Sequence, residues 1–296
     1  MEKRITIITH SGSFHPDDVF AVASLLLLHE GKSVMPEVVR TRDPHILQTG
    51  DFVLDVGGVY DASTNRFDHH QIDGAGVRPN RIPYASFGLV WKKYGAEIAG
   101  SPEVAGELER RLVIQIDALD NGVEAVAPLI EGVRPYLVNH VIFSYIPTWK
   151  SSEPLDEAFL VAVGFAKELL KREIRSAADK IEGERFVEEA YQNAVDKRLI
   201  MLDREYFWAE QLARHPEPLL VIYPQRENYH IKAVRDSLVS FKTRVSFPES
   251  WAGKRDVELA KVTGVPDAFF CHNKRFMVVA GSKEGALALA QKALKA

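Results

Sequence analysis

The sequence predicts a two-domain α/β protein, with a parallel-sheet domain first, a helical connector next and a smaller α+β domain last. The 296 residues exceed the usual size of one domain. In the first half of the chain, strand-like apolar runs alternate with helical patterns, which is typical of a parallel sheet covered by helices. After a long helical stretch, short strand patterns return near Leu219. We therefore expect domains at residues 1–150 and 216–296, joined by a helical connector at 151–215.

The N-terminal domain is predicted to begin with a buried strand at residues 4–9, which are rich in β-branched side chains. Pro16 marks the start of a helix, with Asp17 and Asp18 near the positive end of its dipole. This helix should continue through Leu28. Further along, we expect strands at 34–40 and 52–55, a hairpin at 60–67, a loop at 72–82, and helices at 86–94 and 103–119.

The connector has helical periodicity over residues 155–212 and is predicted to form two helices that separate near Glu182 and Gly183. The C-terminal domain should then combine four strands with two helices. The strands are expected at 219–223, 230–234, 268–271 and 276–280, and the helices at 256–263 and 283–294.

The composition is that of an ordinary globular protein, with 46% hydrophobic and 26% charged residues. No apolar run reaches the length of a membrane span, and the first strand is too short for the apolar core of a signal peptide. The single cysteine, Cys271, excludes an internal disulfide and fits a reducing compartment. We expect a cytoplasmic protein without a membrane partner, and homo-oligomerisation stays open.

The charge is unevenly distributed along the chain. Residues 1–150 contain 14 basic and 19 acidic residues, a net charge of −5, and residues 151–215 contain 10 and 14, a net charge of −4. Residues 216–296 contain 13 basic and 8 acidic residues, a net charge of +5. This division fits an acidic metal site and a basic arm for an anionic substrate, but solubility alone is an equally good explanation.

Four stretches place histidines and aspartates where predicted strands or helices end, at residues 9–18, 53–58, 67–70 and 116–122. Mixed imidazole and carboxylate ligands suit manganese, iron, cobalt or zinc better than calcium or magnesium. Six ligands are enough for two ions that share one carboxylate and clamp the oxygens of a phosphoryl group. The six candidates are His10, His15, Asp17, Asp55, His69 and Asp120.

Some of these residues also have ordinary explanations. Asp117 and Asp120 are three residues apart on one helix face, near a C-terminus whose dipole disfavours carboxylates. A compensating positive charge is therefore expected there, and a metal ion would supply it. A single strand-end aspartate or paired histidine is weak evidence for a site, whereas four such stretches within one α/β pattern are strong evidence. We expect structural or surface roles for four other histidines and assign no role to His140. The four are His29, His45, His215 and His230.

The tetrapeptide Phe67-Asp68-His69-His70 resembles the signature of the DHH phosphoesterase superfamily. Within it, the MYG1 branch (UPF0160) resembles this sequence more closely. The matching stretches lie at residues 9–10, 14–18, 55–58, 67–70, 116–122, 147–149, 247–251 and 270–272. The resemblance implies a metal-dependent hydrolase, and the branch includes proteins described as 3′–5′ RNA exonucleases. It therefore implies a DHH-type α/β fold and RNA or short oligonucleotides as substrates.

Two other functions remain compatible with the sequence. One is a small-molecule phosphohydrolase that acts on pyrophosphate or a nucleotide, as some members of the wider superfamily do. The other is a metal-bound binding or regulatory protein with little turnover, because the first-metal ligands depart from the superfamily pattern. That pattern has a carboxylate four residues after the first histidine, whereas here His15 follows His10 after four intervening residues.

The resemblance also implies individual roles. His10 and Asp55 would bind the first metal, and Asp55 would bridge to a second ion. His70 would face the substrate phosphate, and Asp68 would orient an imidazole. Manganese is the favoured ion, with zinc, iron, cobalt and magnesium as alternatives. The second metal would be bound by Asp17, Asp55, His69 and Asp120, where Asp120 is preferred to Asp117 because Asp-Asn-Gly matches the superfamily's Asp-Thr-Gly.

The basic C-terminal domain should supply phosphate contacts away from the scissile bond. Arg235 ends a predicted strand, and Lys274 and Arg275 lie in a predicted hairpin turn beside His272. The expected substrate contacts are Arg235, Arg244, His272, Lys274 and Arg275.

Overall fold

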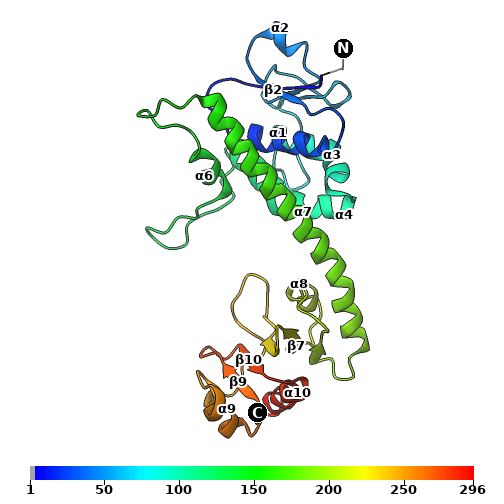
Figure 1. Cartoon of the computed structure of the whole chain (residues 1–296), viewed down its shortest axis with the longest axis vertical. Helices are drawn as coiled ribbons and strands as arrows, with labels where there is room; N and C mark the ends of the chain where they lie inside the picture. The colour runs from blue at the N-terminus through cyan, green and yellow to red at the C-terminus, as the bar shows by residue number, and fades with distance from the viewer. Residues whose placement is uncertain (1–3) are drawn as a thin grey trace. The chain divides into compact units, whose positions relative to one another are not determined.

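The structure is a computed structural model that describes residues 4–296 and divides into two compact units between Ala178 and Asp179 (Figure 1). This division falls within the predicted connector and within one long helix, α7 (Leu155–Asn193). The two units are described separately below. Within residues 4–296, none of the helices combines the length and the apolar character that a membrane span requires.

The first unit contains a five-stranded sheet that is largely parallel, as predicted. Its strand order is β2-β1-β3-β5-β4, in which β4 alone runs antiparallel to its neighbour. The strands are β1 (Thr6–Thr9), β2 (Glu37–Arg40), β3 (Phe52–Leu54), β4 (Tyr60–Asp61) and β5 (Arg66–Phe67).

The strand order makes the carboxyl edge of this sheet a natural place for a site. Ile7 and Ile8 in β1 are both fully buried, as expected for a central parallel strand covered on both faces. The chain passes from β1 to β2 on one side and then crosses to β3 on the other side. The carboxyl end of β1 is therefore a topological switch point, where open α/β sheets bind ligands.

The predicted hairpin before the paired histidines is confirmed. β4 and β5 pair antiparallel around a short 3₁₀ turn, Ala62–Thr64. Asn65 completes the turn in the left-handed region, with φ of 57°, a conformation that asparagine tolerates better than most residues. The hairpin places the residues after β5 at the same sheet edge as the ends of β1 and β3.

Helices α1 (Pro16–Leu28) and α3 (Ser86–Ala99) pack against each other in the first unit. Phe20 and Phe87 lie at this contact, with ring centroids 5.4 Å apart. The helix predicted at 103–119 is present but contains a π-helical segment. It consists of α4 (Pro102–Leu108), the π segment Glu109–Val113 and α5 (Ile114–Asp120). The first unit also contains two short helices, α2 (Pro44–Leu47) and α6 (Val138–Phe143), and the first part of α7.

The predicted break near Glu182 and Gly183 is wrong, because α7 continues without interruption through both residues. A Cβ atom at position 183 would lie 3.2 Å from Cδ1 of Tyr206. The glycine thus makes room for an aromatic ring rather than ending the helix. The part of the connector predicted as a second helix instead ends in a strand, β6 (Leu199–Met201), and the short helix α8 (Ala209–Ala213).

The second unit is an α+β domain, as predicted, with a mainly antiparallel sheet in the order β6-β7-β8-β10-β9. Leu220 and Ile222 belong to one apolar cluster, and the alternating Val221 and Tyr223 belong to another. The sheet is therefore covered on both faces. The remaining elements are β7 (Leu220–Gln225), β8 (Asn228–Ala233), the 3₁₀ helix Glu249–Trp251, α9 (Asp256–Thr263), β9 (Ala268–Cys271), β10 (Met277–Ala280) and α10 (Lys283–Ala293).

Candidate metal centre and its adjoining pocket

Three neighbouring strands of the first unit deliver the candidate ligands to one place. His10 directly follows β1, Asp55 directly follows β3, and Asp68 directly follows β5. Because these strands are parallel, their carboxyl ends meet at the same edge of the sheet. His15 and Asp17 reach this edge from the start of α1.

Asp55 lies at the centre of the cluster. Its Oδ2 atom is 3.4 Å from Nε2 of His10 and 3.9 Å from Nδ1 of His15. Its Oδ1 atom is 3.2 Å from Nε2 of His69 and 3.4 Å from Nδ1 of His70. The two oxygens of one carboxylate therefore face two separate groups of ligand atoms, which is the arrangement expected of a bridging ligand.

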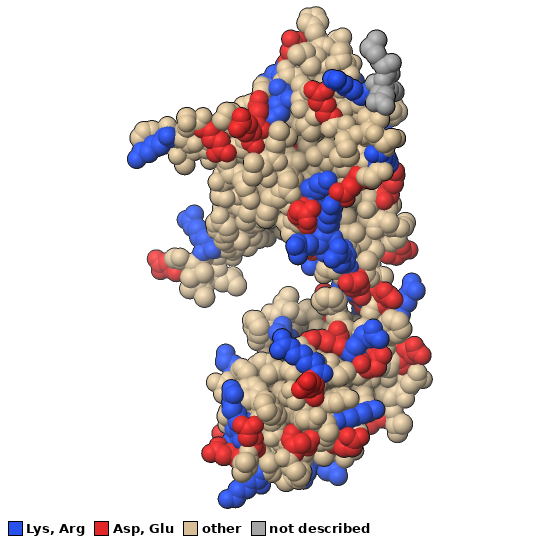
Figure 2. All heavy atoms as spheres, in the orientation of Figure 1, with Lys and Arg blue, Asp and Glu red and all other residues tan. Residues whose placement is uncertain are grey.

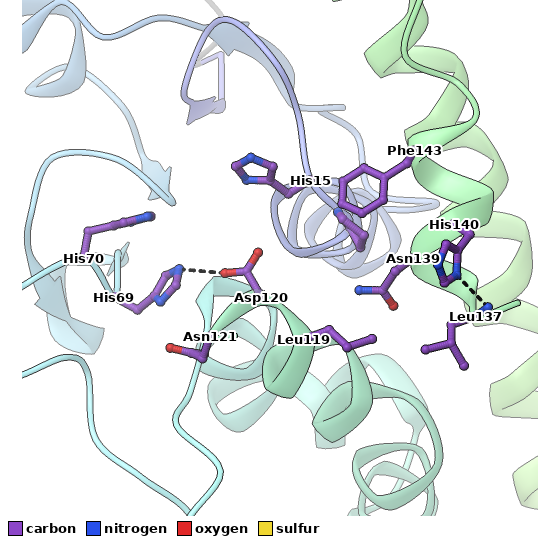
Figure 3. Close-up of a pocket in the computed structure, with 11 residues that line it drawn as sticks. His15, His69, His70, Leu119, Asp120, Asn121, Leu137, Asn139, His140 and Phe143 are labelled. Carbon is purple, nitrogen blue, oxygen red and sulfur yellow. Dashed lines mark hydrogen bonds and ion pairs between the residues drawn. The ribbon is translucent and has the colours of Figure 1, made fainter. Parts of the chain in front are cut away.

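A second group of ligand atoms is formed by Asp17, His69 and Asp120. Nε2 of His69 is 3.2 Å from Oδ2 of Asp120 (Figure 3) and 3.9 Å from Oδ2 of Asp17. Asp120, the last residue of α5, thus joins the cluster. The structure brings together all six of the residues expected to be metal ligands.

Asp117 has a different role from the one that its position beside Asp120 indicated. Its carboxylate is fully buried, with Oδ2 2.7 Å from Nη2 of Arg78 and Oδ1 accepting a 3.1 Å hydrogen bond from the Gly88 backbone. A Cβ at Gly88 would collide with this carboxylate. The compensating positive charge expected near these two aspartates is therefore, for Asp117, an arginine and not a metal.

Asp17 also supports the fold. Its Oδ1 atom accepts a 2.7 Å hydrogen bond from the Phe87 backbone, and its Oδ2 atom accepts a 2.9 Å bond from the Ser86 backbone. N–H groups in the first turn of a helix have no acceptor within the helix, so the carboxylate of Asp17 stabilises the start of α3. Asp17 thus connects the metal cluster to the helix that packs on α1.

Asp18 is a site residue that the sequence did not reveal. Its Oδ1 atom accepts a 2.8 Å hydrogen bond from the His15 backbone and so caps the start of α1. Its buried Oδ2 atom, however, lies 3.3 Å from Nε2 of His10. Two adjacent acids at a helix start look alike in sequence, and only the fold shows that both side chains reach the cluster.

The cluster fits divalent cations because it contains buried ligand atoms without partners. Among residues 4–296, no hydrogen-bond partner is found for Nε2 of His10, for Nε2 of His69 or for either carboxylate oxygen of Asp55. Buried polar atoms are normally paired, so such a concentration is costly unless a ligand satisfies it. Imidazole and carboxylate donors are also the set that manganese, iron, cobalt and zinc share.

The electrostatics of the cluster favour positive charge. Burial lowers the pKa of His10 and His69, yet nearby carboxylates outweigh it and raise the pKa to about 10 for His10 and about 11 for His69. Burial raises the pKa of Asp17, and the neighbouring carboxylates of Asp120 and Asp55 raise it further. Burial opposes ionisation of Asp55 as well, but three imidazoles lower its pKa below the usual range. A field that retains protons on imidazoles would also attract metal cations.

Asp68 holds the paired histidines in position. Its Oδ1 atom accepts backbone hydrogen bonds from His69 at 2.7 Å and His70 at 3.1 Å, and it lies 2.8 Å from Nδ1 of His70. Its Oδ2 atom accepts a 2.5 Å bond from the Gly58 backbone. The contact to Nδ1 orients the His70 ring, whose side chain is 60% exposed.

Two cavities adjoin the cluster. The larger, of about 630 Å³, combines metal-site residues with apolar and amide side chains from α5 and α6 (Figure 3). The smaller, of about 330 Å³, is lined by Gly57, Gly58 and Arg42 beside the metal ligands. Sequence reasoning missed Arg42, Asn139 and Phe143 at these cavities, since no motif marks them. His140, to which we assigned no role, accepts a 2.9 Å bond from the Leu137 backbone at the start of α6.

The expected substrate contacts in the second unit have varied surroundings. The Arg244 guanidinium donates to the backbone carbonyls of His215, Pro218 and Ala213, so it holds these loop segments together. The Arg235 guanidinium lies 4.8 Å from the Phe241 ring.

The hairpin beside His272 remains exposed at its tip. The ring of His272 packs 4.3 Å from that of Phe276, and its Nδ1 atom accepts a bond from the Lys274 backbone. Lys274 is exposed, and Arg275 makes a long contact of 3.4 Å to the Phe247 carbonyl. On the face of this unit visible in Figure 2, basic and acidic side chains are interspersed.

The other histidines agree with structural or surface roles. His29 is buried, and its Nδ1 atom lies 2.8 Å from the Leu25 carbonyl. His215 pairs with Glu188 at 2.8 Å. His45 is exposed, and His230 is partly buried beside Tyr223.

Comparison with known proteins identifies relatives over nearly the whole chain. The chain is 30% identical to a MYG1 protein of Schizosaccharomyces pombe over 99% of its own length and 98% of the relative's. It is 31% identical to the MYG1 exonuclease of Homo sapiens, over 97% of this chain and 85% of the relative. It is also 31% identical to a MYG1 protein of Chlamydia muridarum, over 93% and 92% of the two chains.

Among solved structures, the RecJ structure from Thermus thermophilus in complex with Mg²⁺ aligns with 98% of this chain and 50% of its own, at 9% identity and a TM-score of 0.30. The model of an uncharacterised protein family, UPF0160, whose short name is MYG1_exonuc, matches residues 6–294. Together with the relatives above, this match shows that the chain belongs to the MYG1 (UPF0160) family.

Proposed function

We propose that the protein is a metal-dependent phosphodiester hydrolase that acts on RNA or short oligonucleotides as a 3′–5′ exonuclease. The observation that carries the proposal is the position of Asp55 between two groups of ligand atoms, at the open edge of the sheet. The names of the bovine and human relatives, both called MYG1 exonuclease, support the same activity.

Two divalent ions, with manganese favoured, would activate water and neutralise the phosphoryl oxygens when bound. His10, His15 and Asp55 would bind one ion, and Asp17, Asp55, His69 and Asp120 would bind the other. Asp18 would orient His10 through the contact between its Oδ2 atom and Nε2, or replace His15 as a ligand.

The chain's own residues would position the phosphate. His70 is exposed beside both cavities and is oriented by Asp68, so it can donate a proton or a hydrogen bond to a phosphate oxygen. Arg42 lines the smaller cavity, and its Nε atom donates to the Ser11 carbonyl at 3.2 Å. The remaining guanidinium nitrogens would bind a second phosphate oxygen.

A small-molecule phosphohydrolase is the second candidate. It is favoured by the acidic character of the first unit, which would repel a long anionic polymer more than a compact substrate. The cytoplasmic location expected from the single cysteine is compatible with both activities.

A turnover panel distinguishes these candidates. Purified protein would be assayed with Mn²⁺, and with EDTA in parallel, on end-labelled RNA, oligonucleotides of a few residues, pyrophosphate and bis(p-nitrophenyl) phosphate. We expect EDTA-sensitive release of mononucleotides from the 3′ end of RNA or oligonucleotides. Faster turnover of pyrophosphate than of every oligonucleotide would favour the second candidate, and activity that survives full chelation would contradict both.

A further inference from the structure

One face of α6 lines the larger cavity opposite the metal ligands. This cavity is lined by His15, His69, His70 and Asp120 together with Leu119, Leu137, Asn139 and Phe143. In Figure 3, Asn139 lies across the cavity from His69 and His70. Asn139 and Phe143 are four residues apart on the same helix, so their side chains lie on one face.

Asn139 is an unusual residue for this position because its amide is buried and incompletely paired. The residue is 6% exposed, and among residues 4–296 no hydrogen-bond partner is found for its Oδ1 atom. In Figure 3 its side chain points from α6 toward the side of the cavity that carries Asp120. A buried amide without a partner destabilises the free protein, and an apolar residue of similar shape would avoid that cost.

The local fold does not require this amide. The start of α6 is capped by His140, whose Nδ1 atom accepts the Leu137 N–H, so Asn139 is not needed there. The next turn of the same face presents the Phe143 ring, which is 46% exposed, although large aromatic rings are usually covered. An unpaired amide and an uncovered ring therefore stand side by side at the cavity wall.

We propose that this face of α6 is a nucleoside subsite, in which Phe143 contacts a base or sugar and Asn139 reads one polar group of that nucleoside. The assignment rests on the proposed function, because the phosphate of the same nucleotide would occupy the metal site. The cavity volume of about 630 Å³ lies within the roughly 300–1,000 Å³ of small-molecule sites.

The chemistry of an amide suits this task. Rotation about its last side-chain bond exchanges the NH₂ donor with the carbonyl acceptor, and no protein partner of Oδ1 fixes the orientation. A ribose 2′-hydroxyl both donates and accepts, and so does the edge of a base. Apolar contact with the Phe143 ring tolerates any base, since every base has a flat face. Asn139 would thus determine specificity without taking part in bond cleavage.

The test is equilibrium binding of adenosine 5′-monophosphate to the full chain loaded with Mn²⁺. We expect Asn139→Leu to weaken binding about 10- to 100-fold, the usual consequence of an unpaired polar group. Phe143→Ala should also weaken binding, whereas Ser144→Ala should not, since Ser144 is exposed on the same helix and bonds only to the Val141 carbonyl. Metal content should stay unchanged in Asn139→Leu, because Asn139 is not one of the candidate metal ligands.

Two analogues identify the group that Asn139 reads. If the group is the sugar hydroxyl, 2′-deoxyadenosine 5′-monophosphate should bind weakly to the wild type, and Asn139→Leu should remove this difference. If it is the adenine amine, purine riboside 5′-monophosphate should behave in that way instead. The melting temperature of Asn139→Leu should equal or exceed that of the wild type, which a structural hydrogen bond would not allow.

The proposal is overturned if Asn139→Leu binds all three nucleotides as the wild type does, or if the wild type binds none of them. It is also overturned if Asn139→Leu lowers the melting temperature and weakens every ligand equally. A wild type that binds the nucleotide normally but cleaves no oligonucleotide would contradict the proposed exonuclease activity and leave the subsite supported.

Discussion

Asp55 has a backbone φ of 55°, a left-handed conformation that is unfavourable for a residue with a Cβ. Its N–H donates to the Phe67 carbonyl at 3.2 Å, which holds this conformation at the end of β3. In this conformation both oxygens of the carboxylate face ligand atoms. Strained residues concentrate at functional sites, and this one stands where the two proposed metal positions meet.

The paired histidines should have separable functions. His69→Ala should lose bound metal and turnover together, because His69 contacts both Asp55 and Asp120. His70→Ala should keep its metal and lose turnover by about 10²- to 10⁴-fold, the range for a general acid or a positioned donor. Elemental analysis and kinetics on the two variants measure this split. His45→Ala, at an exposed histidine, is the control, and equal metal loss in both variants would rule out the division.

The clustering of the six candidate ligands could be predicted from the sequence, because each lies close to the end of a strand or at the start or end of a helix, within four short motifs. Asp18 and Arg42 could not be, since their roles depend on the direction of a side chain across the site. Asp117 shows the same limit. Its sequence spacing to Asp120 matches that of a shared helix face, but its partner, Arg78, lies 39 residues earlier in the chain.

Strand β2 supports the loop that carries His10 and His15. Nη2 of Arg40 donates to the Gly12 carbonyl at 2.6 Å, and Nη1 lies 2.6 Å from Oδ1 of Asp156 at the start of α7. The guanidinium also lies 4.5 Å from the Phe159 ring. One nearly buried side chain, 3% exposed, therefore joins a strand, a ligand-bearing loop and a helix.

Arg40→Met should weaken metal binding by about tenfold and destabilise the protein by about 1 kcal/mol, since methionine keeps the apolar stem but removes the hydrogen bonds to the Gly12 carbonyl and to the exposed Asp156 carboxylate. Metal titration and chemical denaturation measure the two effects. Arg4→Met is a matched control, because the Arg4 side chain is 85% exposed and its ion pair with Glu37 is long at 3.8 Å. An Arg40→Met variant with normal metal affinity would show that the loop is held without this side chain.

Most strands and helices could be predicted from the periodicity of apolar residues in the sequence. The length of α7 could not, because the sequence predicted a break within it. Gly183 looks like a helix breaker in the sequence, yet its missing side chain makes space for Tyr206, 23 positions later. Packing against a distant ring is invisible to local patterns. The helical prediction for residues 199–201 is wrong for the same reason, because the pairing partner of β6, β7, begins only at Leu220.

Basic residues outnumber acidic residues only in the last part of the chain, residues 216–296. On the face of this part visible in Figure 2, the basic side chains are nevertheless mixed with acidic ones. Of the arginines expected to bind substrate, Arg244 is committed to backbone carbonyls. Arg235 and Arg275 remain as candidate phosphate contacts. On this face the basic side chains form no broad patch, so the proposed substrate arm would depend there on a few side chains.

Replacing Arg235 and Arg275 together with glutamine should raise KM for an oligonucleotide and flatten the dependence of binding on salt, because fewer phosphates would be neutralised. Hydrolysis of bis(p-nitrophenyl) phosphate should be nearly unchanged, since that substrate reaches only the metal site. Steady-state kinetics at several salt concentrations give the comparison. An equal loss on both substrates would mean that the two arginines support the fold.

Metal stoichiometry in single-ligand variants tests the shared-carboxylate arrangement most directly. We expect about two Mn²⁺ ions per wild-type chain, about one each in His10→Ala and Asp120→Ala, and almost none in Asp55→Ala. The reason is that His10 and Asp120 belong to different groups of ligand atoms, while the carboxylate of Asp55 faces both groups. Elemental analysis after dialysis would provide the counts. One ion in the wild type, or an Asp55→Ala variant that still binds two, would contradict the dinuclear site.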